Sequence, residues 1–181
     1  MIQKYIFGTY IETEAVVKEI AESVGQIPYL TKESDHVFTY QMGEDDIVYG
    51  LGESIRGMNK RGWVYEAYCN DDPNHIENIR SLYGAHNFFL VDGAETFGVF
   101  VDAPQKVQFD IGYTEREMMK ITIAEGGYVI YIVEGDSPSE IVREFRSLIG
   151  RSYIPPKWAF GYGQSRWGYK NEADIRKVAE E

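Results

Sequence analysis

Residues 106–133 read KVQFDIGYTEREMMKITIAEGGYVIYIV, and this stretch decides the fold class. It predicts three strands, at 106–111, 119–124 and 128–133: apolar and polar residues alternate in 107–111, and glycines separate the runs. Similar runs occur earlier in the chain, at 3–10, 36–41, 47–50, 87–90 and 96–101. Many short strands joined by Gly-rich turns predict a mainly β protein, an antiparallel β-sandwich. Residues 14–23 fit either a helix or a strand, and their neighbourhood favours a strand.

The sequence pattern changes after residue 136. Ser137 and Glu140 form a capping box around Pro138 at the first helical position, and apolar residues then recur at helical spacing as far as Gly150. This pattern predicts a helix near 138–149 at the end of a sandwich domain that spans 1–150. The pair Pro155-Pro156 neither continues a helix nor donates to a sheet, so 151–156 is expected to be a linker.

The last segment, 157–181, is expected to form a strand, a loop and a helix. The strand is predicted at 158–163, and a helix follows with Asn171 as its N-cap and Asp174 at the third position. A segment of this size has no core of its own, and no residue near 181 closes the helix. It is therefore expected to be the first βα unit of a truncated (β/α)8 barrel.

Composition excludes several classes of function. The 181 residues are 44% hydrophobic and carry a net charge of −11, which argues against nucleic acid and anionic membranes as partners. Cys69 is the only cysteine and the three histidines are scattered without metal-ligand spacing, so we expect no internal disulfide and no metal site built from these residues. Residues 1–8 do not resemble a signal segment and no apolar run could span a membrane, which predicts a cytoplasmic protein.

Four segments are candidates for chemistry. Gly50-Leu51-Gly52-Glu53 lacks the third glycine of a dinucleotide fingerprint and is interpreted as a bend between strands. Asp45-Asp46 is interpreted as a solvated hairpin turn, because adjacent carboxylates rarely form a catalytic pair. The loop around Asp71, near three aromatic residues, is either an Asx-rich turn or a sugar-binding loop. Residues 165–170 follow the predicted barrel strand, where barrel enzymes hold their substrates; alternatively, Trp167 packs on the sandwich.

From about Tyr49 to Glu181 the sequence resembles glycoside hydrolase family 31, the α-glucosidase family. The resemblance rests on six short motifs that occur in order: YGLGE (49–53), LYGAHNFFL (82–90), GVF (98–100), GDSP (135–138), PPKWAFG (155–161) and QSRWGY (164–169). It implies an N-terminal β-sandwich, then a catalytic (β/α)8 barrel that acts on α-linked glucosides with retention and uses no metal or cofactor. The family's nucleophile and acid/base aspartates lie in later barrel motifs that this sequence lacks, so no catalytic residue is assigned.

The resemblance carries over three substrate-binding residues. By its distance before Leu82, Asp71 resembles the aspartate of a sandwich loop that bonds the sugar in family members. Residues 166–169 match the family's Arg-Tyr-Gly-Tyr, which makes Trp167 and Tyr169 binding residues at the rim of the pocket. Tryptophan at 167 replaces the commoner tyrosine, and we expect the larger indole to bias which glucosidic linkage fits.

The sequence thus predicts part of an exo-acting retaining α-glucosidase that removes terminal glucose from short α-glucosides. Its partners would be that substrate and the rest of its own barrel, and a homo-oligomer remains open. This chain by itself would be inactive. One alternative is an α-xylosidase or other α-glycosidase of the same family. The alternative from another class is a sugar-binding β-sandwich without catalysis.

Overall fold

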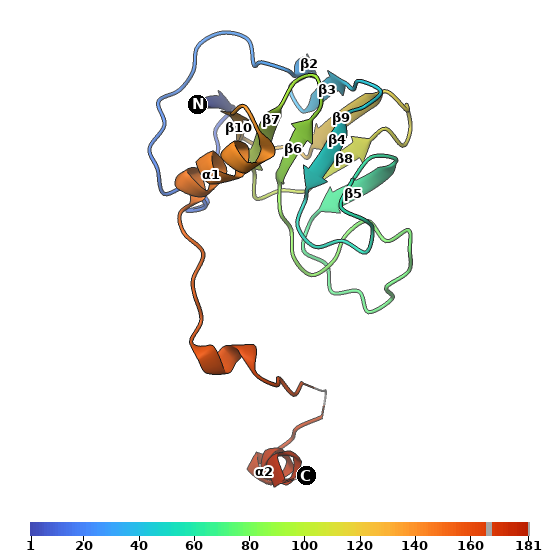
Figure 1. Ribbon diagram of the computed structural model, residues 1–181, viewed down its shortest axis with the longest axis vertical. Coiled ribbons are helices and arrows are strands. Elements are labelled where there is room, and N and C mark those ends of the chain that lie inside the picture. Colours follow the sequence, from blue (N-terminus) through green and yellow to red (C-terminus); the bar gives the residue numbers. More distant parts are fainter. Residues whose placement is uncertain (166–167, 181) are drawn as a thin grey trace. The chain divides into compact units, whose positions relative to one another are not determined.

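The computed structural model describes residues 1–165 and 168–180, which form two compact units. Unit 1 spans Met1–Arg151 and unit 2 spans Ser152–Glu181. Unit 1 holds all ten strands of the described residues and the helix α1, as Figure 1 shows. Unit 2 holds a short 3-10 helix, η1 (Lys157–Phe160), and the helix α2 (Glu172–Glu180).

Unit 1 is a sandwich of two five-stranded sheets in which every paired strand is antiparallel. Sheet A has the order β1, β10, β7, β6, β4, with bounds Ile2–Phe7, Tyr128–Glu134, Phe97–Asp102, Phe88–Asp92 and Ile47–Gly50. Sheet B has the order β2, β3, β9, β8, β5, with bounds Thr31–Ser34, Val37–Gln41, Met118–Ile123, Val107–Ile111 and Trp63–Ala67. The predicted sandwich is confirmed.

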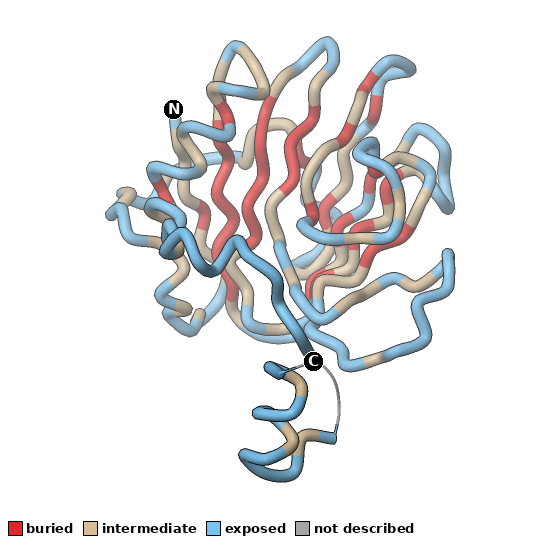
Figure 2. Tube along the Cα trace, turned by 60° about the horizontal axis from the view of Figure 1, so that its bottom comes forward, coloured by how far each residue is buried: buried red, intermediate tan, exposed pale blue. Residues whose placement is uncertain are grey.

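The main core lies between the two sheets. Strand register aligns Phe38, Ile121 and Phe109 across sheet B, and all three side chains are fully buried. Phe109 meets Phe89 of sheet A edge to face, with ring centroids 5.8 Å apart. In Figure 2 the buried residues follow the strands and the exposed ones follow the loops. The alternating residues of 106–111 thus form a strand with one buried face, as predicted.

Strand β10 is buried on both faces, which explains why its sequence YVIYIV does not alternate. Tyr128, Ile130 and Ile132 enter the main core, while Val129 and Tyr131 face a second cluster outside sheet A. The helix α1 (Pro138–Ile149) covers that outer face, with Leu148 in the second cluster.

Both ends of α1 are capped. The Ser137 side chain accepts a hydrogen bond from the Glu140 amide (3.3 Å), as the capping box predicted, while the Glu140 carboxylate accepts from the Asp136 amide (2.9 Å). At the other end, the amides of Val17 and Lys18 donate to the carbonyl of Leu148 (2.9 and 3.3 Å). The segment around Val17 therefore serves as a C-terminal cap for a helix more than a hundred residues away in the chain.

Residues 14–23 were predicted as a strand, and that prediction is wrong. The segment is irregular apart from one isolated bridge between Glu22 and Lys4. Its apolar residues Ala15, Val16 and Ile20 pack on the second cluster beside α1. The spacing of these apolar residues reflects their contacts with α1 and sheet A, and the segment itself is neither a helix nor a strand.

Asp45-Asp46 does not lie in a solvated hairpin. The strands on either side, β3 and β4, belong to different sheets, so the connection crosses the sandwich. Asp46 is 4% exposed and accepts hydrogen bonds from the Tyr40 hydroxyl (2.8 Å) and the Gly43 amide (2.9 Å). Asp45 is exposed, so only one of the two carboxylates faces solvent.

The strand predicted at 158–163 is absent from the described residues. Lys157–Phe160 is a 3-10 helix, and no regular element follows before residue 165. A parallel barrel strand is stable only beside neighbouring strands, and unit 2 contains none within its described residues. The helix prediction is confirmed: the Asp174 amide donates to the Asn171 side chain (3.1 Å) just before α2. Among the residues described here, no helix is long and apolar enough to cross a membrane.

Candidate functional site

The segment 68–87, which connects β5 to β6, is a long irregular segment that projects from the strands of unit 1 (Figure 1). Its two limbs are joined at the base. The Glu66 amide donates to the Arg80 carbonyl (2.8 Å), the Asn70 amide donates to the Leu82 carbonyl (3.2 Å), and the Ser81 hydroxyl donates to the Tyr68 carbonyl. The tip of this loop is therefore 71–79. Ordered connections of such length are uncommon in compact domains and are usually functional.

The two adjacent carboxylates of the tip, Asp71 and Asp72, differ in their contacts. Asp72 is half-buried and accepts hydrogen bonds from both the backbone amide (2.9 Å) and the side-chain amide (3.1 Å) of Asn74. Asp72 is thus the residue that makes the Asx turn. Asp71 is exposed and forms no hydrogen bond or ion pair within residues 1–165 and 168–180. The turn leaves Asp71 free to accept hydrogen bonds from a ligand.

An ion-pair cluster lies at the base of the loop. The Glu66 carboxylate is 2.7 Å from the Lys106 ammonium and 3.7 Å from the Arg80 guanidinium, and it accepts a hydrogen bond from the Gln108 side chain (3.3 Å). Burial raises the pKa of Glu66, but the hydrogen bonds and charges of these partners outweigh burial, so its pKa lies below the usual range. Glu66 therefore stays ionised at neutral pH.

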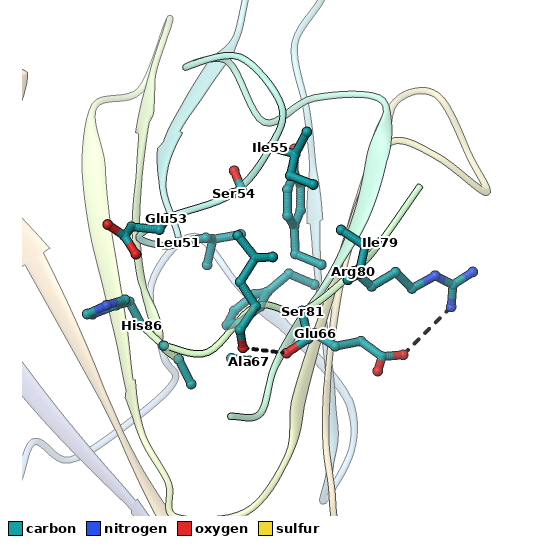
Figure 3. A pocket seen from close by; sticks show the side chains of 15 residues that line it. Leu51, Glu53, Ser54, Ile55, Glu66, Ala67, Ile79, Arg80, Ser81 and His86 are labelled. Carbon is teal, nitrogen blue, oxygen red and sulfur yellow. Dashed lines mark hydrogen bonds and ion pairs between the residues drawn. The ribbon is translucent and has the colours of Figure 1, made fainter. Parts of the chain in front are cut away.

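Behind the loop is a cavity of about 20 Å³, lined by Leu51, Ser54, Tyr65, Arg80, His86 and their neighbours (Figure 3). This volume holds about one water molecule and excludes a sugar ring. The Tyr65 hydroxyl is buried without a hydrogen-bond partner in the described part of the chain. The cavity is thus part of the support beneath the loop, and it does not itself hold a sugar.

The glycine motif YGLGE (49–53) also belongs to this support. The Leu51 amide donates to the Phe88 carbonyl (2.7 Å), and a Cβ on Gly50 would come within 2.5 Å of the same oxygen. A Cβ on Gly52 would overlap the His86 ring. These glycines let 49–53 approach 86–88 closely, so the interpretation as a bend between strands is confirmed.

Unit 2 carries the other predicted binding residues. Tyr169 is half-buried, and its hydroxyl accepts a hydrogen bond from the Gln164 side chain (3.3 Å), which in turn accepts from the Tyr162 hydroxyl (2.5 Å). Trp167 lies outside the described residues. That Asp71 of unit 1 and Tyr169 of unit 2 face the same substrate stays a prediction.

Sequence reasoning missed the Glu66 cluster. Its members come from β5, the turn before β8 and the returning limb of the loop, so no local motif marks them. Only the register of β5 and β8, which places Glu66 opposite Gln108, brings these residues together. In the part of the chain that the structure describes, no group of three or more His, Cys, Asp or Glu residues could hold a metal ion.

Comparison with known proteins decides the family. The family model described as "Glycosyl hydrolase 31 N-terminal galactose mutarotase-like domain" matches residues 21–110. A second family model, "Glycosyl hydrolases family 31 TIM-barrel domain", matches residues 152–181. The chain belongs to glycoside hydrolase family 31. Unit 1 is thus the family 31 sandwich, and unit 2 matches its barrel domain.

Relatives within family 31 differ in their substrates. The chain is 34% identical over 158 residues to α-glucosidase 2 of Bacillus thermoamyloliquefaciens, an alignment that covers 79% of this chain and 19% of that protein. It is 30% identical over 120 residues to an α-xylosidase of Lactiplantibacillus pentosus, which covers 66% of this chain and 15% of that protein. The chain therefore spans a fifth or less of the length of these relatives.

Solved family 31 structures share the fold. A dextranase from Flavobacterium johnsoniae, complexed with isomaltotriose, has a TM-score of 0.71 at 27% identity. The alignment covers 84% of this chain and 19% of that chain. It again matches a small part of a much longer protein.

Proposed function

We propose that this chain contributes the sandwich and the first part of the barrel to an exo-acting retaining α-glucosidase. Membership of family 31 and the similarity to an α-glucosidase support this activity. The substrates would be short α-glucosides with a terminal glucose. No cofactor or metal is needed for such hydrolysis, since two carboxyl groups about 5 Å apart perform it by double displacement.

The observation that carries the proposal is the exposed Asp71 at the tip of a loop with an anchored base. A carboxylate accepts hydrogen bonds from the hydroxyls of a sugar, and these charge-assisted bonds are stronger than neutral ones. Because Asp72 makes the turn, Asp71 can be used for binding without loss of the loop's conformation. We propose that Asp71, Trp167 and Tyr169 bind the substrate, and that none of the described carboxylates is the nucleophile.

Sequencing first establishes whether the reading frame continues past residue 181. The first experiment then compares this chain with the product of the complete reading frame. Nitrophenyl α-glucoside is the substrate for both proteins. We expect hydrolysis by a product that includes the whole barrel and none by the 181-residue chain, because both catalytic carboxyls are proposed to lie outside it. Enzyme-dependent release of nitrophenol by the 181-residue chain would overturn this division of roles.

The second experiment replaces Asp71 with alanine in that longer product. We expect kcat/KM for maltose to fall by an amount that corresponds to about 1–3 kcal/mol of lost transition-state stabilisation, because sugar hydroxyls lose a charged acceptor. The melting temperature should change little. Glu77→Ala is the matched control, since Glu77 is an exposed carboxylate of the same loop tip. If Asp71→Ala lowers the melting temperature and leaves kcat/KM of the folded enzyme unchanged, Asp71 is a structural residue.

The alternative activity is that of an α-xylosidase, and the similarity to one favours testing it. Nitrophenyl α-xyloside and α-glucoside assayed side by side distinguish the two activities. Sugar binding without hydrolysis of either substrate by the complete product would favour the third possibility, a non-catalytic carbohydrate-binding sandwich.

We also propose a cytoplasmic location, which the single, exposed Cys69 supports because reduced thiols persist there. Fractionation of the source cells tests it. Recovery of the protein outside the cytoplasmic membrane would contradict it.

A further inference from the structure

Few contacts join the two limbs of the 68–87 loop at its base. The loop leaves β5, an edge strand of sheet B, and returns beside it. Two backbone hydrogen bonds and one from Ser81 join the limbs, and the residues that they connect are exposed or half-buried. Surface backbone bonds of this kind open easily, so they alone would leave the position of the tip weakly determined.

The Glu66 carboxylate adds a connection from the loop to the rest of sheet B. Glu66 binds Arg80 twice, through its amide on the Arg80 carbonyl (2.8 Å) and through its carboxylate beside the guanidinium (3.7 Å). The same carboxylate is 2.7 Å from Lys106, which immediately precedes β8. Figure 3 shows the carboxylate of Glu66 facing the guanidinium of Arg80. The returning limb is thus linked through Glu66 to a strand that pairs with β5 along its whole length.

Two properties distinguish this cluster from an ordinary surface ion pair. The Glu66 side chain is only 22% exposed, and the hydrogen bond from Gln108 on β8 fixes its orientation. A single carboxylate therefore bridges two cations from different elements, an arrangement in which ion pairs contribute more than isolated exposed pairs do.

We infer that Glu66 is a positioning residue that holds the returning limb of the 68–87 loop and thereby sets where the Asp71 tip lies. Glu66 acts through the loop and does not contact the substrate. This inference rests on the proposed role of Asp71 in substrate binding. It predicts that removing the charge of Glu66 loosens the loop, weakens substrate binding and leaves the chemical step unchanged.

The first test measures amide hydrogen exchange in the 181-residue chain. In Glu66→Gln we expect the Asn70 amide, which donates to Leu82, to exchange about twofold to fivefold faster, with the amides of β10 unchanged. Lys106→Gln should have the same effect, and it changes only an exposed side chain. Glu77→Gln, which removes the same charge from the loop tip, should change nothing. Unaltered exchange at Asn70 in both Glu66→Gln and Lys106→Gln would overturn the inference.

The second test measures kinetics in the product of the complete reading frame. We expect Glu66→Gln and Lys106→Gln to raise KM for maltose about twofold to fivefold with kcat unchanged, whereas Glu77→Gln should leave both constants unchanged. Asp71→Ala is assayed alongside. If Asp71→Ala raises KM and Glu66→Gln does not, the positioning role is wrong and the proposed function stands. If neither changes KM, the proposed role of the loop in binding is wrong, and the positioning role fails with it.

Discussion

The two units of this chain contrast in how they use aromatic and aliphatic residues. Most of the large apolar side chains of unit 1 are buried or half-buried, between the two sheets or under α1. Unit 2 is also rich in such residues, yet Tyr153, Trp158, Phe160 and Tyr162 are each more than 70% exposed, and none of its described residues is buried. Apolar content alone therefore does not make a core. A core forms where several elements bring apolar faces together, and unit 2 has only two short helices among its described residues.

The largest expected effect separates the cores of the two units. Phe109→Ala removes a fully buried ring at the centre of sheet B and should lower the free energy of unfolding by about 3–5 kcal/mol. Trp158→Ala removes a larger ring that is 81% exposed and should change it by less than about 0.5 kcal/mol. Urea denaturation of both variants of the 181-residue chain measures the difference. A large loss in Trp158→Ala would mean that unit 2 packs on a core after all.

A second comparison uses a glycine from each unit. Gly50 has a positive φ of 115°, and an added Cβ would lie 2.5 Å from the Phe88 carbonyl oxygen, so Gly50→Ala should cost about 1–3 kcal/mol. A Cβ added to Gly163 would meet no atom within 4 Å, so Gly163→Ala should leave stability unchanged. Melting temperatures of the two variants provide the measurement. Equal melting temperatures would show that the bend after β4 adapts to a side chain.

A third comparison lies within unit 1, between two adjacent carboxylates. Asp46→Asn weakens two charge-assisted hydrogen bonds to a buried group and should lower stability by about 1–2 kcal/mol. Asp45→Asn changes an exposed residue and should have no measurable effect. Denaturant midpoints distinguish them, and similar midpoints would mean that solvent reaches Asp46.

The smallest expected effect is a pH dependence that only unit 1 should show. The pKa of Glu66 is lowered in the folded state, so the stability that its ionised form contributes is present above the unfolded pKa and disappears as pH falls through the folded pKa. At pH 7 Glu66→Gln should therefore be less stable than the unaltered chain by about 1 kcal/mol or less, measured as a lower melting temperature, and this difference should shrink as pH falls through the folded pKa.

The matched control is an ion pair in unit 2. Glu172 and Arg176 approach to 2.5 Å on α2, but both side chains are more than 70% exposed. Glu172→Gln should leave the melting of unit 1 unchanged throughout the same pH range. A difference between Glu66→Gln and the unaltered chain that does not shrink as pH falls would show that packing of the side chain, and not its charge, is responsible.

Much of the fold was predictable because its signals are local. The strands at 106–111 and 119–124 alternate in polarity, and the capping box at Ser137 marks the start of α1. By contrast, β2 and β5 were not predicted. β2 is four exposed residues and β5 lies among aromatic residues that suggested a binding loop, so only their pairing with β3 and β8 identifies them as strands.

The candidate site divides in the same way. Asp71 could be proposed from the sequence because it stands at a fixed distance from a motif, which is a property of the chain alone. Which of Asp71 and Asp72 makes the turn, and that Asp46 is buried, are set by hydrogen bonds that form only when the backbone folds. The sequence by itself determined the sandwich, the helix α1 and the family, since periodicity and motifs need no partner. Only the tertiary structure decided the Glu66 cluster, the irregular path of 14–23 and the 3-10 helix at 157–160, because each depends on which distant elements are, or are not, beside it.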